Sequence, residues 1–278
     1  MVRPTARRPA VANVQQTHGL SERGACRALG MPRASHRYRS RKESPDPLVT
    51  RLRALAAMRP RAGYRTLCTL LRREGVRVNP KRVYRLYRAE GLSIRVKRRR
   101  RLAASPRQVP RPATRPWQRW AMDFMSDSTT DGHRFRIRTL VDIFSRRGPG
   151  VIVERSIGGT RVVAFLDEVA AVHGYPESLN VDNGPEFISK ALDQWAHAHG
   201  VTLYFSRPGK PVDNAFIESF NGRLRDECLN TNWFYGLQQA REVIDAWLKD
   251  YNEHRPHSSL AGLTPVEYEK QVRTSPTD

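Results

Sequence analysis

The chain has 278 residues with 49 Lys and Arg against 27 Asp and Glu, which gives a net charge of +22. Residues 1–116 hold 31 basic and 5 acidic side chains, whereas residues 117–278 hold 18 and 22, so the positive excess belongs to the first part. A charge of one sign at this density favours a polyanionic partner, nucleic acid above all. No apolar run reaches the length of a membrane span and no signal peptide is visible, which predicts a soluble, cytoplasmic protein with no membrane partner.

The three cysteines, Cys26, Cys68 and Cys228, are far apart and show no C-x-x-C spacing. This pattern excludes a disulfide framework and a zinc-finger site, and it predicts reduced, partly buried thiols. A length of 278 residues allows two domains, at least one of them with a sizeable core.

Residues 1–47 are predicted to form a basic segment with a weak helix-turn-helix outline, followed by a linker. Ser21 is a suitable N-cap for a short helix that Gly30 ends, and a second basic segment runs to Tyr38. Residues 39–47 are polar and contain two prolines, which is typical of a linker.

Residues 48–92 are predicted to form a helical DNA-binding domain of three helices. Leucines at helical spacing mark the first two, and Asn79 with Pro80 supplies a cap and a first-turn proline for the third. The third helix carries basic residues on its exposed side: Lys81, Arg82, Arg85 and Arg88. Such a helix fits a DNA groove or backbone; the alternative is a solvated helix of a small bundle, and the single sign of charge along this half favours DNA.

Residues 93–116 are predicted to be an extended basic linker rich in proline and arginine. A run of positive charge within it is expected to lie along phosphates and includes Lys97, Arg98, Arg99 and Arg100. The linker therefore separates two regions of opposite composition, with a boundary at about residue 116.

Residues 117–278 have the pattern of an α/β core. Three strands are expected first, at 117–125, 135–144 and 151–157, and they fit an antiparallel meander. Helices at 161–172 and 187–199 then alternate with strands at 178–181 and 201–205, and a helix from Asp213 to Leu229 follows. The prediction is a mixed five-stranded sheet flanked by helices on both faces.

Three acidic residues of this part stand out by position. Asp123 lies inside a predicted strand among apolar residues, Asp182 follows the end of a strand, and Glu218 lies on the polar side of a helix. Carboxylates brought together repel one another unless a divalent cation neutralises them, and Mg²⁺ or Mn²⁺ prefers such ligands. Two such ions can activate a hydroxyl nucleophile and stabilise the leaving oxygen of a phosphodiester. Spacing alone does not select these three among the 22 acidic residues present.

The helix around Glu218 is expected to have one polar and one apolar side. At about 100° per residue, three side chains fall near Glu218: Asn214, Asn221 and Arg225. The apolar side is expected to hold Phe216, Ile217, Phe220 and Leu224. Taken alone, Glu218 would be an ordinary solvated side chain.

The three carboxylates lie in motifs that are specific in combination. These are WAMDF at 120–124, VDNGPEF at 181–187 and NAFIESFNGRLR at 214–225, with 35 residues between Asp182 and Glu218. They closely resemble the DDE catalytic core of the second-reading-frame (OrfB-type) transposases of the IS-three group of bacterial insertion sequences. The segment YNEHRPHSSL at 251–260 and the helical region at 64–92 resemble the same family, so the resemblance covers nearly the whole chain.

This resemblance implies an RNase H-like fold similar to that of retroviral integrase. It implies that Asp123 is shared by two metal ions, that Asp182 and Glu218 complete one site each, and that Arg225 contacts substrate DNA. Two asparagines would orient the site or touch DNA: Asn214 and Asn221. The activity implied is metal-dependent nicking at the ends of an insertion sequence, followed by attack of a 3′-hydroxyl on a phosphodiester.

The partners implied are the terminal inverted repeats, target DNA and further copies of the chain on DNA, in the nucleoid of a bacterial cell. No sustained heptad repeat is present, so a first-frame protein, or a fusion with it, is expected to complete the enzyme. One rival function is a non-catalytic DNA-binding regulator of transposition, against which the intact triad argues. A simple ribonuclease is the other, and the long basic arm makes it the weaker reading.

Several other polar residues are given structural roles. Because the triad is already filled, capping or structural roles are expected for Asp127, Asp142 and Glu186. Packing and surface roles are expected for Tyr251, Arg255 and His257. The glycines in the segment 146–150 suggest a bulge or a distorted hairpin between the second and third strands.

Overall fold

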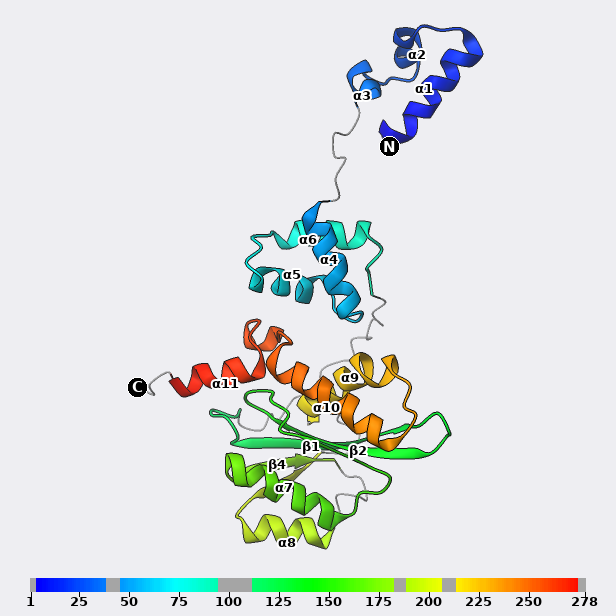
Figure 1. The fold of residues 1–278 in the computed structure, drawn as a ribbon. Helices are drawn as coiled ribbons and strands as arrows, with labels where there is room; N and C mark the ends of the chain where they lie inside the picture. The colour runs from blue at the N-terminus through cyan, green and yellow to red at the C-terminus, as the bar shows by residue number, and fades with distance from the viewer. Residues whose placement is uncertain (1–3, 39–45, 95–111, 183–188, 207–213, 275–278) are drawn as a thin grey trace. The chain divides into compact units, whose positions relative to one another are not determined.

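The computed structural model describes residues 4–38, 46–94, 112–182, 189–206 and 214–274 (Figure 1). The chain divides into two compact units, residues 1–51 and 52–278. The predicted phosphate contacts Lys97, Arg98, Arg99 and Arg100 lie outside the described residues, as does Glu186. Across the described part of the chain, no helix has both the length and the apolar character needed to cross a membrane.

The first unit contains three short helices, α1 (Pro4–His18), α2 (Glu22–Ala28) and α3 (Arg33–Arg37). Ser21 caps α2 as predicted, because its hydroxyl accepts a hydrogen bond from the Gly24 amide at 3.2 Å. α1 is not predicted from the sequence: Pro9 lies inside the helix, and of its described side chains only that of Val11 is buried. The small core of this unit is formed by Val11, Ala25, Cys26 and Met31.

The predicted three-helix region is confirmed as α4 (Pro47–Met58), α5 (Tyr64–Arg73) and α6 (Pro80–Ala89). The Asn79 side chain caps α6 by accepting a hydrogen bond from the Lys81 amide at 2.8 Å. Val83 and Tyr87 are buried beneath α6. The four basic residues of the helix are exposed, as predicted: Lys81, Arg82, Arg85 and Arg88.

The sheet has five strands in the order β3-β2-β1-β4-β5, which confirms the predicted mixed sheet. β1 (Arg119–Ser128), β2 (Arg134–Asp142) and β3 (Val151–Glu154) form the antiparallel meander, and β4 (Ser178–Val181) and β5 (Thr202–Phe205) run parallel to β1. β1 begins two residues later than predicted. Trp117 adopts a positive φ of 64° and donates its backbone N–H to the side-chain carboxylate of Asp142 instead of to a backbone carbonyl of the strand.

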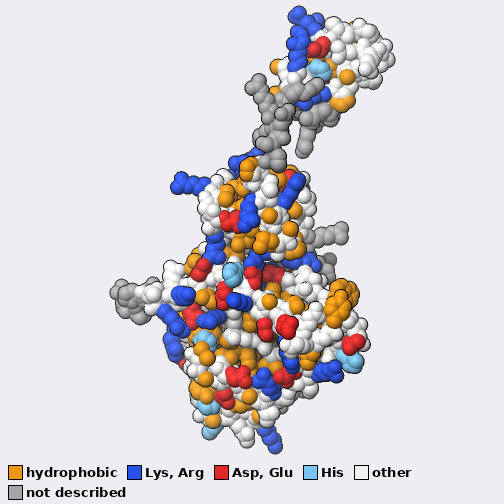
Figure 2. All heavy atoms as spheres, in the orientation of Figure 1, with side chains coloured by type: hydrophobic (Ala, Val, Ile, Leu, Met, Phe, Trp, Pro, Cys, Tyr) orange, Lys and Arg blue, Asp and Glu red, His pale blue; other side chains and the backbone are white. Residues whose placement is uncertain are grey.

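Helices cover both faces of the sheet (Figure 1). α7 (Gly159–His173) and α8 (Lys190–Ala198) pack on one face over Trp120, Met122 and Leu179. α9 (Ala215–Glu227) and α10 (Leu237–Glu253) pack on the other over Ala121, Ile137 and Val141. The alternation of β1 therefore points Asp123 to the side of α9. Figure 2 shows basic and acidic side chains intermixed over the sheet-containing part, in keeping with its 18 basic and 22 acidic residues.

The chain ends with two elements that the sequence analysis leaves unassigned, α10 and α11 (Pro265–Thr274). Glu269 of α11 is 3% exposed and joins this helix to the start of β1. Its carboxylate accepts hydrogen bonds from Trp117 Nε1 at 2.8 Å and from Arg147 Nη1 at 2.7 Å. A buried carboxylate held by an indole and a guanidinium is a structural tie between distant parts of the core.

The segment between β2 and β3 is shaped by contact with α9 and α10. A Cβ atom on Gly148 would lie 2.8 Å from Leu248 Cδ1 and 3.0 Å from Phe220 Cε2. The Asn252 side chain binds the same glycine twice, accepting from its N–H at 3.0 Å and donating to its carbonyl at 2.8 Å. Glycine is required here by the close approach of the backbone to both helices.

Candidate active site

Asp123 lies in the middle of β1, paired in register with Thr139 of β2. It is half-buried, and its Oδ1 accepts a hydrogen bond from the Phe124 amide at 2.7 Å. Its Oδ2 accepts a hydrogen bond from Asn221 Nδ2 of α9 at 2.8 Å. Each carboxylate oxygen thus has one N–H donor and keeps a second lone pair available.

Asp182 directly follows β4, at the carboxyl end of the parallel pair. Asn180 pairs with Ala121, so continuing this register by two residues brings Asp182 level with Asp123 on the neighbouring strand. The carboxyl ends of parallel strands are where ligand sites gather in α/β sheets. The structure therefore brings together two of the predicted carboxylates through the sheet itself.

Glu218 supplies the third carboxylate from the first turn of α9, where its side chain is exposed. The pKa of Asp123 is raised to about 6, mainly by burial of its carboxyl group, and the negative charges of Asp182 and Glu218 act in the same direction. Hydrogen bonds from Phe124 and Asn221 oppose that rise. Asp182 and Glu218 therefore act electrostatically on Asp123, although the three carboxylates come from three separate elements.

The faces of α9 differ from the prediction at three positions. Phe216 is 41% exposed, with the Arg146 guanidinium 3.9 Å from its ring centre, and it does not join the apolar side. Asn221 is only 8% exposed, because it turns under Asp123, and Asn214 is 5% exposed at the start of the helix. Ile217, Phe220 and Leu224 are buried as predicted. The helical wheel places both asparagines on the polar side, but both are buried, and Asn221 contacts the sheet through Asp123 and Thr139.

The sequence and fold around this site are those of a known family. Residues 113–211 and 199–265 match models of the integrase core domain, and residues 45–101 match an HTH-like domain. The chain is 44% identical to the insertion element IS407 uncharacterized 31.7 kDa protein of Burkholderia multivorans, over 94% of this chain and 95% of that protein. The chain belongs to the insertion-sequence transposases of the IS-three group.

Two further comparisons agree with this family. The chain is 28% identical to the putative transposase InsK for insertion sequence element IS150 of Escherichia coli, over 88% of this chain and 92% of that protein. Among solved structures, the intasome of simian T-cell lymphotropic virus in complex with PP2A regulatory subunit B56 gamma aligns with a TM-score of 0.53 and 17% identity. That alignment covers 82% of this chain and 77% of the other. This second likeness establishes the integrase fold.

Arg225 of this transposase lies two turns beyond Glu218 on α9. Its Nη2 donates to the Ser126 carbonyl at 2.9 Å and its Nη1 lies 3.8 Å from Asp127 Oδ2, so the guanidinium lies along the end of β1. The side chain remains 41% exposed. An exposed guanidinium on the helix that carries Glu218 can bind a phosphate that extends beyond the carboxylates.

The other polar residues discussed from the sequence have structural surroundings. Asp127 accepts the Ser128 amide at 2.8 Å, and Asp142 accepts the amides of Trp117 and Ser145, as expected of capping residues. Tyr251 and His257 are buried, in agreement with the packing roles expected of them, and burial lowers the pKa of His257 to about 4. Arg255 forms an ion pair of 2.8 Å with Glu227.

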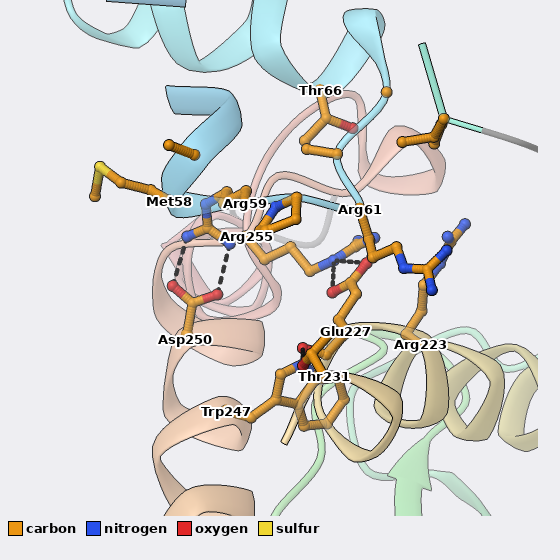
Figure 3. Close-up of a pocket in the computed structure, with 15 residues that line it drawn as sticks. Met58, Arg59, Arg61, Thr66, Arg223, Glu227, Thr231, Trp247, Asp250 and Arg255 are labelled. Atoms are coloured by element: carbon orange, nitrogen blue, oxygen red, sulfur yellow. Dashed lines mark hydrogen bonds and ion pairs between the residues drawn. The ribbon is translucent and has the colours of Figure 1, made fainter. Parts of the chain in front are cut away.

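A cavity of about 670 Å³ in the second unit does not contain the site (Figure 3). It is lined by residues of the α4–α5 connection together with α9 and α10, among them Arg59, Arg223, Glu227, Trp247 and Asp250. Within it the Arg59 guanidinium points at Asp250, with Nη1 2.6 Å from Oδ2. None of the three predicted carboxylates lines this cavity.

The donor chemistry of the site fits a hard divalent cation. The negative charges of Asp182 and Glu218 make the Asp123 carboxyl harder to ionise, and a bound divalent ion would offset that repulsion. Among the described residues, no group of three or more His, Cys, Asp or Glu side chains is already close enough to hold a metal ion. Residues 183–188, directly after Asp182, lie outside the described ranges. So do residues 207–213, shortly before Glu218.

Proposed function

We propose that this transposase is a DDE enzyme that cleaves DNA at the ends of its insertion sequence and transfers the resulting strand to a target. The observation that carries the proposal is the electrostatic coupling of Asp123 to Asp182 and Glu218 at the carboxyl end of β4. An integrase core with an HTH-like domain agrees with such a polynucleotidyl transferase.

Asp123, Asp182 and Glu218 would hold Mg²⁺ or Mn²⁺, with Asp123 shared between two ions. Bound divalent ions supply activation of a water or 3′-hydroxyl and charge stabilisation at the leaving oxygen. The sharing is supported by the two oxygens of Asp123, each of which accepts one N–H and keeps one lone pair. Asn221 would hold the Asp123 carboxylate in a fixed plane. Arg225 would hold a phosphate of the substrate strand at the end of β1.

DNA binding would be divided between two kinds of surface. The exposed cations of α6 would contact the element's terminal repeats: Lys81, Arg82, Arg85 and Arg88. The basic linker would follow the DNA backbone through Lys97, Arg98, Arg99 and Arg100. Asn214, at the start of α9, would touch DNA near the site or orient its first turn. The domains proposed are residues 1–47, 48–92, 93–116 and 117–278.

The working form of the enzyme would be an oligomer of this chain on DNA, in the bacterial nucleoid, with a first-frame transposase protein as partner or fusion. A +26 charge over residues 1–116 supports a large DNA contact. The rival function, a non-catalytic regulator that binds the terminal repeats, does not require the carboxylates of Asp182 and Glu218 to lie near that of Asp123.

The proposal is tested by replacing Asp123, Asp182 and Glu218 singly with alanine. Each variant should lose Mg²⁺-dependent strand transfer by about 1000-fold or more on DNA that carries the element's ends, while binding that DNA as tightly as the wild type. Asp193→Ala, an exposed acidic residue of α8 on the opposite face of the sheet, is the matched control and should remain active. Strand transfer that survives in any of the three variants would refute the assignment.

A further inference from the structure

A buried threonine stands directly opposite the central aspartate of the site. Thr139 pairs with Asp123 across β1 and β2 and is 0% exposed, between the buried residues Arg138 and Leu140 of the same strand. Its Oγ1 lies 2.8 Å from Asn221 Oδ1 and 3.2 Å from the Asp123 carbonyl. A fully buried hydroxyl has to satisfy its hydrogen-bonding groups locally, so these contacts determine what Thr139 does.

The direction of each hydrogen bond in this group follows from its chemistry. An ionised Asp123 carboxylate only accepts, so the group 2.8 Å from its Oδ2 must be the Asn221 amide N–H. The Asn221 carbonyl then points to Thr139 and must receive the hydroxyl proton. The reversed amide would place oxygen against oxygen beside Asp123. Since both Thr139 and Asn221 are buried, water cannot substitute for either partner.

We propose that Thr139 is a positioning residue: its hydroxyl holds the Asn221 amide in the orientation that the ionised Asp123 carboxylate requires, and through that amide it fixes the plane of the carboxylate. This inference rests on the proposed function, in which Asp123 is shared by two cations. With Asn221 on Oδ2 and the Phe124 amide on Oδ1, each oxygen presents its remaining lone pair in a fixed direction. Hydrogen-bonding partners that orient a metal ligand also affect the affinity of the site for its metal ion.

The test measures Mn²⁺ binding by the full-length, metal-free protein without DNA, followed by electron paramagnetic resonance or calorimetry. Thr139→Val keeps the shape of the side chain and removes the hydroxyl, and it should weaken Mn²⁺ binding about 10-fold or more. Thr139→Ser retains the hydroxyl and should bind within about threefold of the wild type. Asn221→Ala should weaken binding at least as much, and the double variant should be no weaker than Asn221→Ala alone.

Strand transfer provides a second readout that a general structural role would not move. In Thr139→Val the Mg²⁺ concentration that gives half the maximal rate should rise about 10-fold, while the rate at saturating Mg²⁺ changes much less. Thr129→Val is the matched control: this threonine is 8% exposed at the end of the same hairpin and its hydroxyl is also hydrogen-bonded, to Asp131 and to the His133 carbonyl. It should lose stability without losing affinity for Mn²⁺.

The inference is overturned if folded Thr139→Val binds Mn²⁺ like the wild type, or if Thr139→Ser is as weak as Thr139→Val, which would make side-chain shape the cause. If Thr139→Val does not fold, Asn221→Ala provides the test. Unchanged Mn²⁺ binding in Asn221→Ala would overturn the inference, because Thr139 is proposed to act on Asp123 through Asn221. Failure of the proposed function would give a different result, because Asp123→Ala would then retain both Mn²⁺ binding and strand transfer. Loss in Asp123→Ala with no change in Thr139→Val would reject the role of Thr139 alone.

Discussion

The surroundings of Asp123 and of Asp142 show two ways of burying a carboxylate in one sheet. Burial raises the pKa of both. Asp142, 0% exposed at the end of β2, accepts the backbone amides of Trp117 and Ser145 at 3.0 and 2.8 Å and the Ser145 hydroxyl at 2.6 Å. Asp123 accepts one backbone amide and one side-chain amide and faces two other carboxylates. Asp142 is enclosed by fixed donors and stabilises a turn. Asp123 lies near two other negative charges, which favours binding of a cation.

The same substitution at the two positions should separate these roles most strongly in activity. Asp123→Asn removes the charge and one of the two oxygens that would bridge two cations, so strand transfer should fall by about 1000-fold or more. Asp142→Asn, measured per folded molecule, should keep activity within about tenfold of the wild type. Equal losses of strand transfer in Asp123→Asn and Asp142→Asn would mean that the different surroundings of the two carboxylates do not determine their roles in catalysis.

Stability should respond in the opposite order. Both oxygens of Asp142 accept backbone amides, so an asparagine there must point its own NH₂ at an N–H that cannot turn away. Leaving one buried donor unpaired costs about 1–3 kcal/mol, so Asp142→Asn should lower the free energy of unfolding by about that amount. Urea unfolding followed by circular dichroism measures it. An unchanged midpoint would show that the turn reorganises around the amide.

The helices and strands could largely be predicted from the sequence, but the contrast between Asp123 and Asp142 could not. The cap Asn79 with Pro80 predicts the start of α6, and the segment 178–181 is found as β4 with the same bounds. The integrase-like motifs select Asp123, Asp182 and Glu218, which spacing alone does not. α10 could also have been predicted, because Ala240, Ile244, Trp247, Leu248 and Tyr251 are buried at helical spacing.

The positions that could not be predicted are those decided by contacts between distant segments. A helical wheel places Asn221 about 60° from Glu218 and so on the polar side. It is buried because its partners, Asp123 and Thr139, lie on strands 98 and 82 residues away in sequence. Phe216 is predicted on the apolar side of α9 but is exposed. The cause is again tertiary, because the positions of β1 and β2 determine which side of α9 faces the sheet. Gly148 is likewise explained only by Leu248 and Phe220.

The smallest expected effect is a gain of stability in metal-free Asp123→Asn. A folded-state pKa of about 6 lies above the ordinary 3.8, so the native protein holds this proton more tightly than the unfolded chain does. Wild-type stability therefore declines as pH rises from about 4 to about 6, and the uncharged asparagine avoids that loss.

At pH 7.5 without metal, Asp123→Asn should be more stable than the wild type by about 1 kcal/mol, and the difference should shrink below pH 5. The amide is tolerated here because the neighbouring donor can turn: Asn221 can reverse, and the Thr139 hydroxyl can then accept its N–H and donate to the Asp123 carbonyl, 3.2 Å away. Backbone amides around Asp142 offer no such reversal. Thermal unfolding at pH 5.0 and 7.5, with and without Mg²⁺, measures the difference, and Mg²⁺ should stabilise only the wild type. A variant less stable than the wild type at pH 7.5 would show that the charge of Asp123 is compensated within the protein, and the distinction from Asp142 would then rest on activity alone.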